Sequence, residues 1–260
     1  MSQAKTITSE TKQAARAASA NRANRANRNG VVSREEWLEA RRALLAREKA
    51  FSHERDALSA ARRALPMVKV EKDYVFEETS GKRTLTDLFD GKRQLIVYHF
   101  MFDPNWDEGC KSCSFVADHF DASLVHLRAR DTAFAVISRA PITKLDPFKA
   151  RMGWKFRWLS STASDFNYDY GVSFRPEEMA ANAVDYNYRK GPFPEREGPG
   201  FSVFLREENE NFHTYSTFGR GLDLMMNTYN YLDLTSLGRQ EQGLGFTMAW
   251  VRHHDRYEGT

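Results

Sequence analysis

The sequence predicts an α/β protein with three layers, in which a central mixed β-sheet is flanked by helices. A continuous apolar run at 95–102 is typical of a strand covered on both faces, and a second such run lies at 132–137. Between them, residues 114–130 carry apolar side chains at helical spacing. This strand–helix–strand order implies parallel neighbours joined by a right-handed crossover. Residues 201–205 and 212–216 flank a short polar turn and predict an antiparallel hairpin, which makes the sheet mixed.

The composition limits the classes of protein that the chain can represent. With 260 residues, of which 41% are hydrophobic and 13% aromatic, the chain is long enough for one large domain or two small ones with a substantial core. No apolar run approaches the roughly 18 residues that a membrane span needs. Two cysteines are too few for a disulfide scaffold. The composition therefore excludes fibrous, wholly disordered and membrane-spanning proteins.

The net charge of +3 is unevenly distributed along the chain. Residues 1–32 hold six basic residues and one acidic residue, whereas the remainder has a small acidic excess. A body that binds nucleic acid would show a basic surplus, so we set that class aside for the body. Residues 1–32 have almost no large apolar side chain and are expected to form a disordered basic tail. The tail lacks the apolar core of a secretory signal, but its Arg- and Ser-rich composition leaves organellar targeting open.

An N-terminal helical extension is predicted at 33–65. Ser33 and Glu36 have the spacing of a capping box, and apolar residues follow at helical intervals. Pro66 ends the helix, and a break near Ser52 is compatible with the sequence.

Residues 66–258 form the expected α/β domain. Alternating apolar and polar residues predict its first strand at 67–76, and a short helical turn follows at 84–89. After the two buried strands, the pattern predicts a helix at 144–152 and a further strand at 154–158.

The last part of the domain is less regular. Residues 175–200 contain four of the eight prolines and are expected to form an irregular insertion before the hairpin. A final helix is predicted at 221–232. Residues 238–260 lack periodicity, but their aromatic residues indicate that this segment packs back on the body.

Cys110 and Cys113 are the most informative residues in the chain. Cys110 falls where a buried strand gives way, through the loop 103–109, to a helix, and Cys113 lies one turn further into that helix. Free amides and the helix dipole favour a thiolate at this position. The CxxC spacing also lets the second thiol attack a mixed disulfide formed at the first. The sequence therefore predicts a redox-active centre with Cys110 as the nucleophile and Cys113 as the resolving thiol.

The order of elements around this pair resembles a thioredoxin fold. Residues 81–100, 148–161 and 170–172 resemble segments of peroxiredoxin-type domains. Residues 33–258 as a whole are similar to a family of predicted dithiol–disulfide oxidoreductases, whose pattern is carried here by His99–Trp106, Gly109–Ser114, Tyr231–Thr235 and Trp250–Asp255. The resemblance implies a thiol–disulfide oxidoreductase that needs no metal or organic cofactor and takes electrons from another dithiol protein or from glutathione.

Several positions depart from the patterns of the better-known families. Asp107 stands where peroxiredoxins place a Thr or Ser that holds the peroxide, and a carboxylate there would repel the thiolate. Gly109 replaces the Trp that thioredoxins place before the first cysteine, with Trp106 further back, and Lys111-Ser112 replaces the inner Gly-Pro. The acidic loop should raise the thiol pKa, whereas Lys111 and the helix end should lower it. The sequence does not decide between these effects.

Trp106 and Pro199 are the expected substrate-binding residues. The thioredoxin fold usually sets a cis proline beside the CxxC, just before the strand that opens the hairpin, and Pro199 is the only proline near that position. A trans bond that merely closes the insertion is the alternative geometry. With either bond, the strand order is expected to place Pro199 close to Cys110 at one edge of the sheet.

Other interpretations of the same residues remain open. The pair can be the centre of a thiol peroxide reductase, which Asp107 disfavours, or a structural dithiol in a non-catalytic thioredoxin-like binding module. It can also be half of a zinc site completed by His253-His254, although no motif demands a metal. His99 is interpreted as a core histidine. The expected partners are protein or small-molecule thiols and disulfides in the cytoplasm, with no membrane or nucleic-acid partner.

Overall fold

The computed structural model describes residues 30–258, so most of the expected tail at 1–32 lies outside the described residues. The chain divides into two compact units. Among the described residues, the smaller consists of 30–60 together with Tyr231–Gln240, and the larger consists of Ala61–Asn230 together with 241–258. The dithiol belongs to the larger unit.

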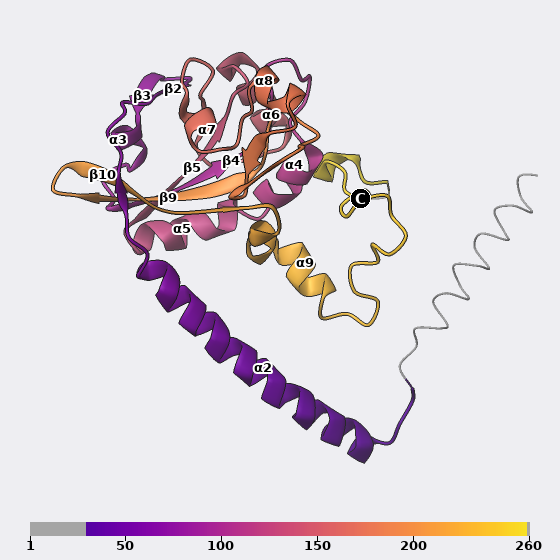
Figure 1. Ribbon diagram of the computed structural model, residues 1–260. Coiled ribbons are helices and arrows are strands. Elements are labelled where there is room, and N and C mark those ends of the chain that lie inside the picture. The colour runs from indigo at the N-terminus through magenta and orange to yellow at the C-terminus, as the bar shows by residue number, and fades with distance from the viewer. Residues whose placement is uncertain (1–29, 259–260) are drawn as a thin grey trace, which may run out of the picture. The chain divides into compact units, whose positions relative to one another are not determined.

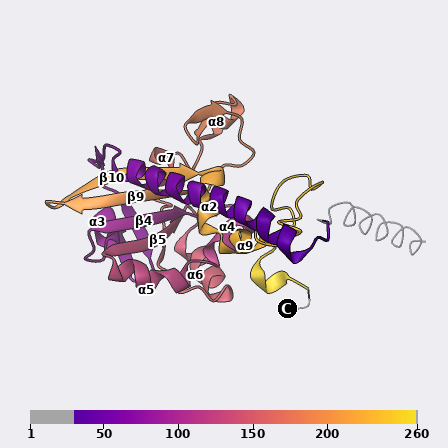
Figure 2. The ribbon, with the colours of Figure 1, turned by 90° about the horizontal axis from the view of Figure 1, so that it is seen from below.

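An eight-stranded mixed sheet organises the larger unit, with the strand order β1-β10-β9-β4-β5-β6-β2-β3. Its strands are β1 (Val68–Lys69), β2 (Val75–Glu78), β3 (Gly81–Thr84), β4 (Gln94–His99), β5 (Thr132–Ser138), β6 (Trp158–Ser160), β9 (Gly200–Glu207) and β10 (Glu210–Phe218). β4, β5 and β6 are parallel, whereas β9 runs antiparallel to β4 and pairs with β10. Figure 2 shows β10, β9, β4 and β5 side by side. The predicted α/β class with a mixed, thioredoxin-like sheet is confirmed.

The helices are α2 (Arg34–Arg63), α3 (Leu85–Leu88), α4 (Lys111–Ala117), α5 (Asp121–Ala129), α6 (Ile142–Arg151), α7 (Phe166–Asp169), α8 (Pro176–Ala180) and α9 (Asn227–Leu232). Figure 1 shows where they lie along the chain. α2 is continuous through the position where a break was considered, and the Ser33–Glu36 capping box is formed. The segment 114–130, expected to be one helix, is divided into α4 and α5. None of the helices within residues 30–258 has the length and apolar character needed to cross a membrane.

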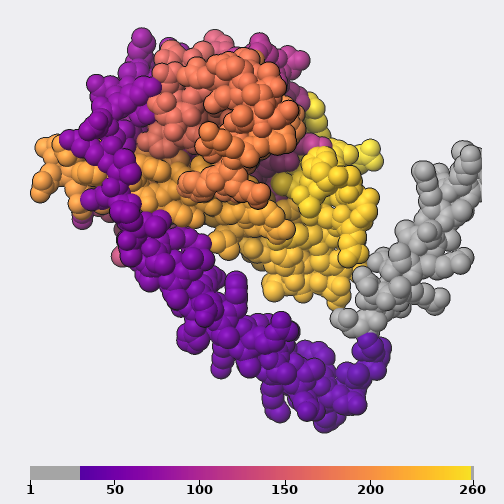
Figure 3. All heavy atoms as spheres, viewed as in Figure 1, coloured from indigo at the N-terminus to yellow at the C-terminus, as the bar shows by residue number. Residues whose placement is uncertain are grey.

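The segment 175–200, expected to be irregular, contains ordered structure. α8 is followed by a small antiparallel pair, β7 (Val184–Tyr186) and β8 (Arg189–Gly191). In Figure 3 the orange atoms of this segment form a continuous part of the surface. The final helix also differs from expectation, because a 3₁₀ segment at Gly219–Met225 precedes the shorter α9.

The two faces of the sheet have separate aromatic cores, since alternate residues of β4 point to opposite faces. Leu95 and Val97 pack with Phe76, Phe166 and Phe204 on one face. Tyr98 packs on the other face, where α4, α5 and α6 cover the sheet, in edge contact with Phe100 and Phe120. This second core ends directly beneath the dithiol.

Candidate active site

The dithiol follows the carboxyl end of β4, after one loop. The loop that follows turns back on itself, and the Cys110 amide donates to the Met101 carbonyl at 3.1 Å. Cys110 occupies the N-cap position of α4 and is partly exposed, whereas Cys113 lies in the first turn and is buried. The two free cysteines are 3.9 Å apart. This distance allows a disulfide to form after a small movement.

The two thiols differ in how readily they ionise. A hydrogen bond from the Cys113 thiol, reinforced by the backbone amides of Cys113 and Ser112, lowers the pKa of Cys110 to about 7 despite its burial. Burial, together with the adjacent Cys110 sulfur, raises the pKa of Cys113 well above its ordinary value. Near neutral pH a large fraction of Cys110 is therefore thiolate, while Cys113 keeps its proton and donates it.

Tyr98 adjoins the buried thiol, and Tyr186 interacts with it electrostatically. The Met101 amide donates to the Cys113 sulfur at 3.5 Å, and the hydroxyl of the fully buried Tyr98 faces the same sulfur. Among the described residues, this hydroxyl has no partner with ordinary hydrogen-bond geometry. Tyr186 lies on β7; burial raises its pKa, and the electrostatic interaction with Cys113 acts in the same direction. A residue of the insertion thus contributes to the dithiol environment.

Basic residues from distant parts of the chain pair with Glu108 and hold the backbone of the loop before Cys110. Arg151 and Arg256 both bond to the Glu108 carboxylate. Lys144 donates to the carbonyls of Pro104 and Trp106, each at 2.8 Å. The competition that the sequence left undecided is won by the groups that lower the pKa of Cys110, first the Cys113 thiol and then the backbone amides at the start of α4.

The C-terminal segment contacts Gly109, the residue directly before Cys110. His253 is buried, and its Nε2 lies 2.9 Å from the Gly109 carbonyl oxygen. Phe148 stacks edge-on against the same imidazole. His254 instead contacts the Asp118 carboxylate at 2.7 Å. Within residues 30–258, no group of three or more His, Cys, Asp or Glu side chains is arranged to hold a metal.

Pro199 lies at the sheet edge from which the dithiol loop leaves. Its neighbour Gly200 pairs with His99, the last residue of β4, and the Tyr186 hydroxyl donates to the Pro199 carbonyl at 2.7 Å. None of the peptide bonds within the described residues is cis, so the bond before Pro199 is trans. Trp106 is partly exposed in the loop. The substrate-binding roles of Pro199 and Trp106 stay predictions.

Sequence reasoning missed three residues that shape this site: Tyr98, Tyr186 and His253. The sequence could have indicated Tyr98, because it lies near the end of the apolar run that precedes the cysteines. Tyr186 was missed because the prolines and glycines of residues 175–200 predicted an irregular segment. His253 was considered only as a metal ligand, whereas the structure uses it as a hydrogen-bonding support for Gly109.

Comparison with known proteins gives a family and several distant structural resemblances. A family model described as "Bacterial protein of unknown function (DUF899)" matches residues 26–257. None of the curated proteins matches the chain significantly.

The similar solved structures include peroxidoxin BcpB from Mycobacterium tuberculosis, at 13% identity over 65% of this chain and 97% of that chain, with a TM-score of 0.44. PrxQ from Xylella fastidiosa is 13% identical over 64% of this chain and 94% of its own, with a TM-score of 0.39. Peroxiredoxin Q from Xanthomonas campestris is 12% identical over 65% of this chain and 97% of its own, with a TM-score of 0.41. Similarity of this degree says nothing about function.

Proposed function

The chain belongs to the DUF899 family of bacterial proteins, and we propose that it is a thiol–disulfide oxidoreductase with Cys110 as the nucleophile and Cys113 as the resolving thiol. The observation that carries this proposal is that the pKa values of the two neighbouring cysteines are shifted in opposite directions. Cys110 is partly exposed with a pKa lowered to about 7, and Cys113 is buried with a raised pKa. A dithiol that reacts in sequence needs this asymmetry, because the thiolate is the attacking form.

The reaction proceeds in two exchanges that balance electrons and protons. The Cys110 thiolate attacks one sulfur of a substrate disulfide, forms a mixed disulfide and releases the first substrate thiolate. That thiolate can take the proton that Cys113 must lose. The Cys113 thiolate then attacks the Cys110 sulfur, which closes the intramolecular disulfide and releases the second substrate thiolate. Two electrons pass to the substrate, and another dithiol protein or glutathione restores the reduced pair.

The surroundings of the pair agree with a substrate that approaches from the loop side. Trp106 is partly exposed there, and Pro199 lies at the same sheet edge. We propose that these two residues border the bound substrate. No metal or organic cofactor takes part in this reaction. We also propose a cytoplasmic location, where the reducing environment would keep the dithiol reduced between turnovers.

Serine variants of the two cysteines test the proposal. We expect Cys110→Ser to abolish exchange with a model disulfide, since the nucleophile is lost. We expect Cys113→Ser to accumulate a mixed disulfide at Cys110, detectable by intact mass, because the resolving step is blocked. Equal thermal unfolding of both variants and the wild type would control for folding. Full exchange activity in Cys110→Ser would refute the assignment.

The same preparation distinguishes the rival functions. A redox titration should give one two-electron transition for the pair, and hydrogen peroxide should oxidise it no faster than it oxidises an ordinary thiol of similar pKa. Rapid, saturable peroxide reduction would instead indicate a thiol peroxide reductase, despite the exposed carboxylate of Asp107. A pair that exchanges with no disulfide would indicate a binding module with a structural dithiol.

A further inference from the structure

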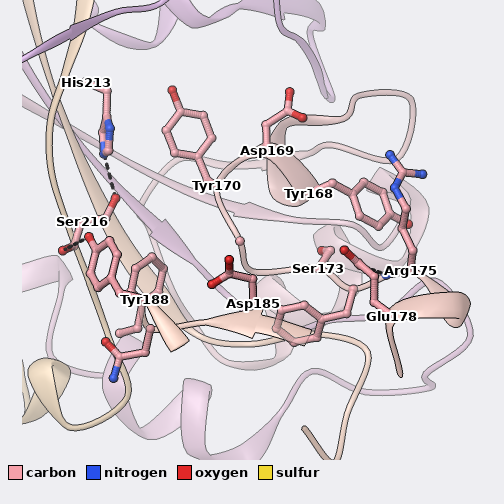
Figure 4. Close-up of a pocket in the computed structure, with 14 residues that line it drawn as sticks. Tyr168, Asp169, Tyr170, Ser173, Arg175, Glu178, Asp185, Tyr188, His213 and Ser216 are labelled. Atoms are coloured by element: carbon pink, nitrogen blue, oxygen red, sulfur yellow. Dashed lines mark hydrogen bonds between the residues drawn. The ribbon is translucent and has the colours of Figure 1, made fainter. Parts of the chain in front are cut away.

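A second concave site lies apart from the dithiol, where α7, α8, β7 and β10 meet (Figure 4). Its volume is about 440 Å³, within the range of roughly 300–1,000 Å³ that is typical of small-molecule sites. Neither cysteine lines it, and Tyr186 does not line it either. Since neighbouring strand residues point to opposite sides, Asp185 can face this pocket while the Tyr186 hydroxyl donates to the Pro199 carbonyl.

Most of the charges around the pocket are already satisfied. Lys72 and the Tyr74 hydroxyl bond to the Asp169 carboxylate, each at 2.8 Å. The Glu178 carboxylate accepts the Arg175 amide at 2.7 Å. The guanidinium of Arg175 is occupied on the ring of Tyr168, 4.6 Å from its centroid.

Asp185 is the exception. Within residues 30–258, its carboxylate forms no ion pair or side-chain hydrogen bond, although Lys190 stands opposite it on β8. Lys190 does not line the pocket. Figure 4 shows the Asp185 carboxylate projecting into the cavity, with Tyr170 and Tyr188 on neighbouring walls.

The wall opposite Asp185 adds aromatic surface without positive charge. His213 lines the pocket, and its Nε2 lies 2.8 Å from the Ser216 hydroxyl. Ser216 in turn bonds to Ser202, which bonds to the Nε2 of His99. Burial lowers the pKa of His213, so its imidazole is neutral at neutral pH. Because the imidazoles at both ends of this hydrogen-bonded series are neutral, all three hydrogen bonds can have the same direction, each group donating to the next from His99 to His213.

We propose that this pocket binds an organic ammonium ion, with the cationic group held between the Asp185 carboxylate and the rings of Tyr170 and Tyr188. An unpaired carboxylate attracts the charge, and aromatic faces stabilise a cation within about 6 Å of their centroids. The rest of the ligand, an aromatic or apolar body, packs on the remaining aromatic walls. A neutral molecule of the same shape lacks the first two interactions, so charge is the property that the site selects.

Titration calorimetry with tyramine and with its neutral analogue 4-hydroxyphenethyl alcohol tests this site on the full-length protein. We expect tyramine to bind about tenfold more tightly than the alcohol, or better. Asp185→Asn should reduce that preference to the part that the aromatic rings provide, and leave the affinity for the alcohol unchanged. Glu177→Gln, an exposed acidic residue of α8 outside the pocket, is the matched control and should retain the preference.

A second measurement separates this site from the dithiol. Cys110→Ser should bind tyramine as the wild type does, so failure of the proposed redox function would leave the ammonium site standing. Equal binding of amine and alcohol by the wild type, an undiminished preference in Asp185→Asn, or no binding of tyramine at millimolar concentration would each overturn the proposal.

Discussion

Cys110 and Cys113 carry the same functional group, yet their pKa values move in opposite directions. The largest cause at Cys110 is the hydrogen bond that it accepts from the Cys113 thiol. At Cys113 the largest cause is burial, and the contact with Cys110 raises the pKa further. The asymmetry is therefore a property of the pair, because the proton that Cys113 keeps is the one that stabilises the Cys110 thiolate.

Replacing Cys113 by Ala or by Ser separates this hydrogen bond from the rest of the site. A serine hydroxyl can still donate to the Cys110 sulfur, whereas alanine cannot. We expect Cys113→Ala to raise the pKa of Cys110 from about 7 towards the ordinary thiol value of 9.0, and Cys113→Ser to raise it less. The pH dependence of alkylation by iodoacetamide measures both. Wild-type midpoints in both variants would show that the backbone amides alone set this pKa.

Tyr98 and Tyr186 should respond differently to loss of their hydroxyl groups. Tyr186 donates to the Pro199 carbonyl and accepts from the Gly219 amide, so Tyr186→Phe leaves two backbone groups unpaired. We expect this change to cost about 1–3 kcal/mol in the free energy of unfolding, measured with urea. Tyr98→Phe removes a hydroxyl without an ordinary partner and should cost close to nothing.

Although Tyr98→Phe should hardly change the stability, it should change the kinetics of the dithiol. The Tyr98 hydroxyl lowers the pKa of Cys113, so its loss should raise that pKa further. The resolving step should then slow, while alkylation of Cys110 stays near the wild-type rate. Stopped-flow measurement of mixed-disulfide decay would test this. An unchanged decay rate would mean that the Tyr98 hydroxyl has no part in resolution.

At the scale of elements, the loop between β4 and α4 depends on close packing at one glycine. A Cβ on Gly109 would lie 2.7 Å from Phe100 Cε1 and 2.9 Å from Phe148 Cε1. Both rings belong to the buried aromatic core. This explains why a Trp, which thioredoxins place at the corresponding position, is absent here: the core occupies the space.

Gly109→Ala should therefore destabilise the protein and disturb the dithiol together. Overpacking of a core typically costs about 1–3 kcal/mol, and the loop that carries Cys110 would have to move. We expect that loss in urea unfolding and a slower exchange reaction. Gly245→Ala is the matched control, because a Cβ there meets no atom within 4 Å. Wild-type stability of Gly109→Ala would contradict the packing argument.

The sequence was informative wherever the signal was local. The buried run before Cys110 and the apolar periodicity after it were enough to place the dithiol at a strand–helix junction. The contacts that tune it are not local. His253 bonds to a carbonyl 144 residues earlier in the chain, and Tyr186 comes from a segment whose composition predicted no order. The competition between Glu108 and the helix end was undecidable for the same reason, since the arginines that neutralise Glu108 lie far along the chain.

At the scale of the whole molecule, two buried groups should give the stability opposite pH dependences. Burial lowers the pKa of His99 from 6.5 to about 3. Between these values the unfolded chain binds a proton that the folded chain does not, so stability falls as the pH decreases. Burial raises the pKa of Glu197 from 4.5 to about 7, despite its bonds to Ser173 and Arg139. In that window the folded chain binds the extra proton, so stability falls as the pH increases.

Replacing either group by glutamine removes its contribution to the pH dependence of the free energy of unfolding. A single group titrating in only one state changes the free energy of unfolding by about 1.4 kcal/mol per pH unit. Relative to the wild type, Glu197→Gln should therefore become more stable as the pH rises from 4.5 to about 7. His99→Gln should become relatively more stable as the pH falls from 6.5 towards about 3. Urea unfolding over this range measures both differences, which do not depend on any constant cost of the substitution. A stability difference that is flat with pH would show, for either variant, that the folded and unfolded chains bind the proton of that group equally.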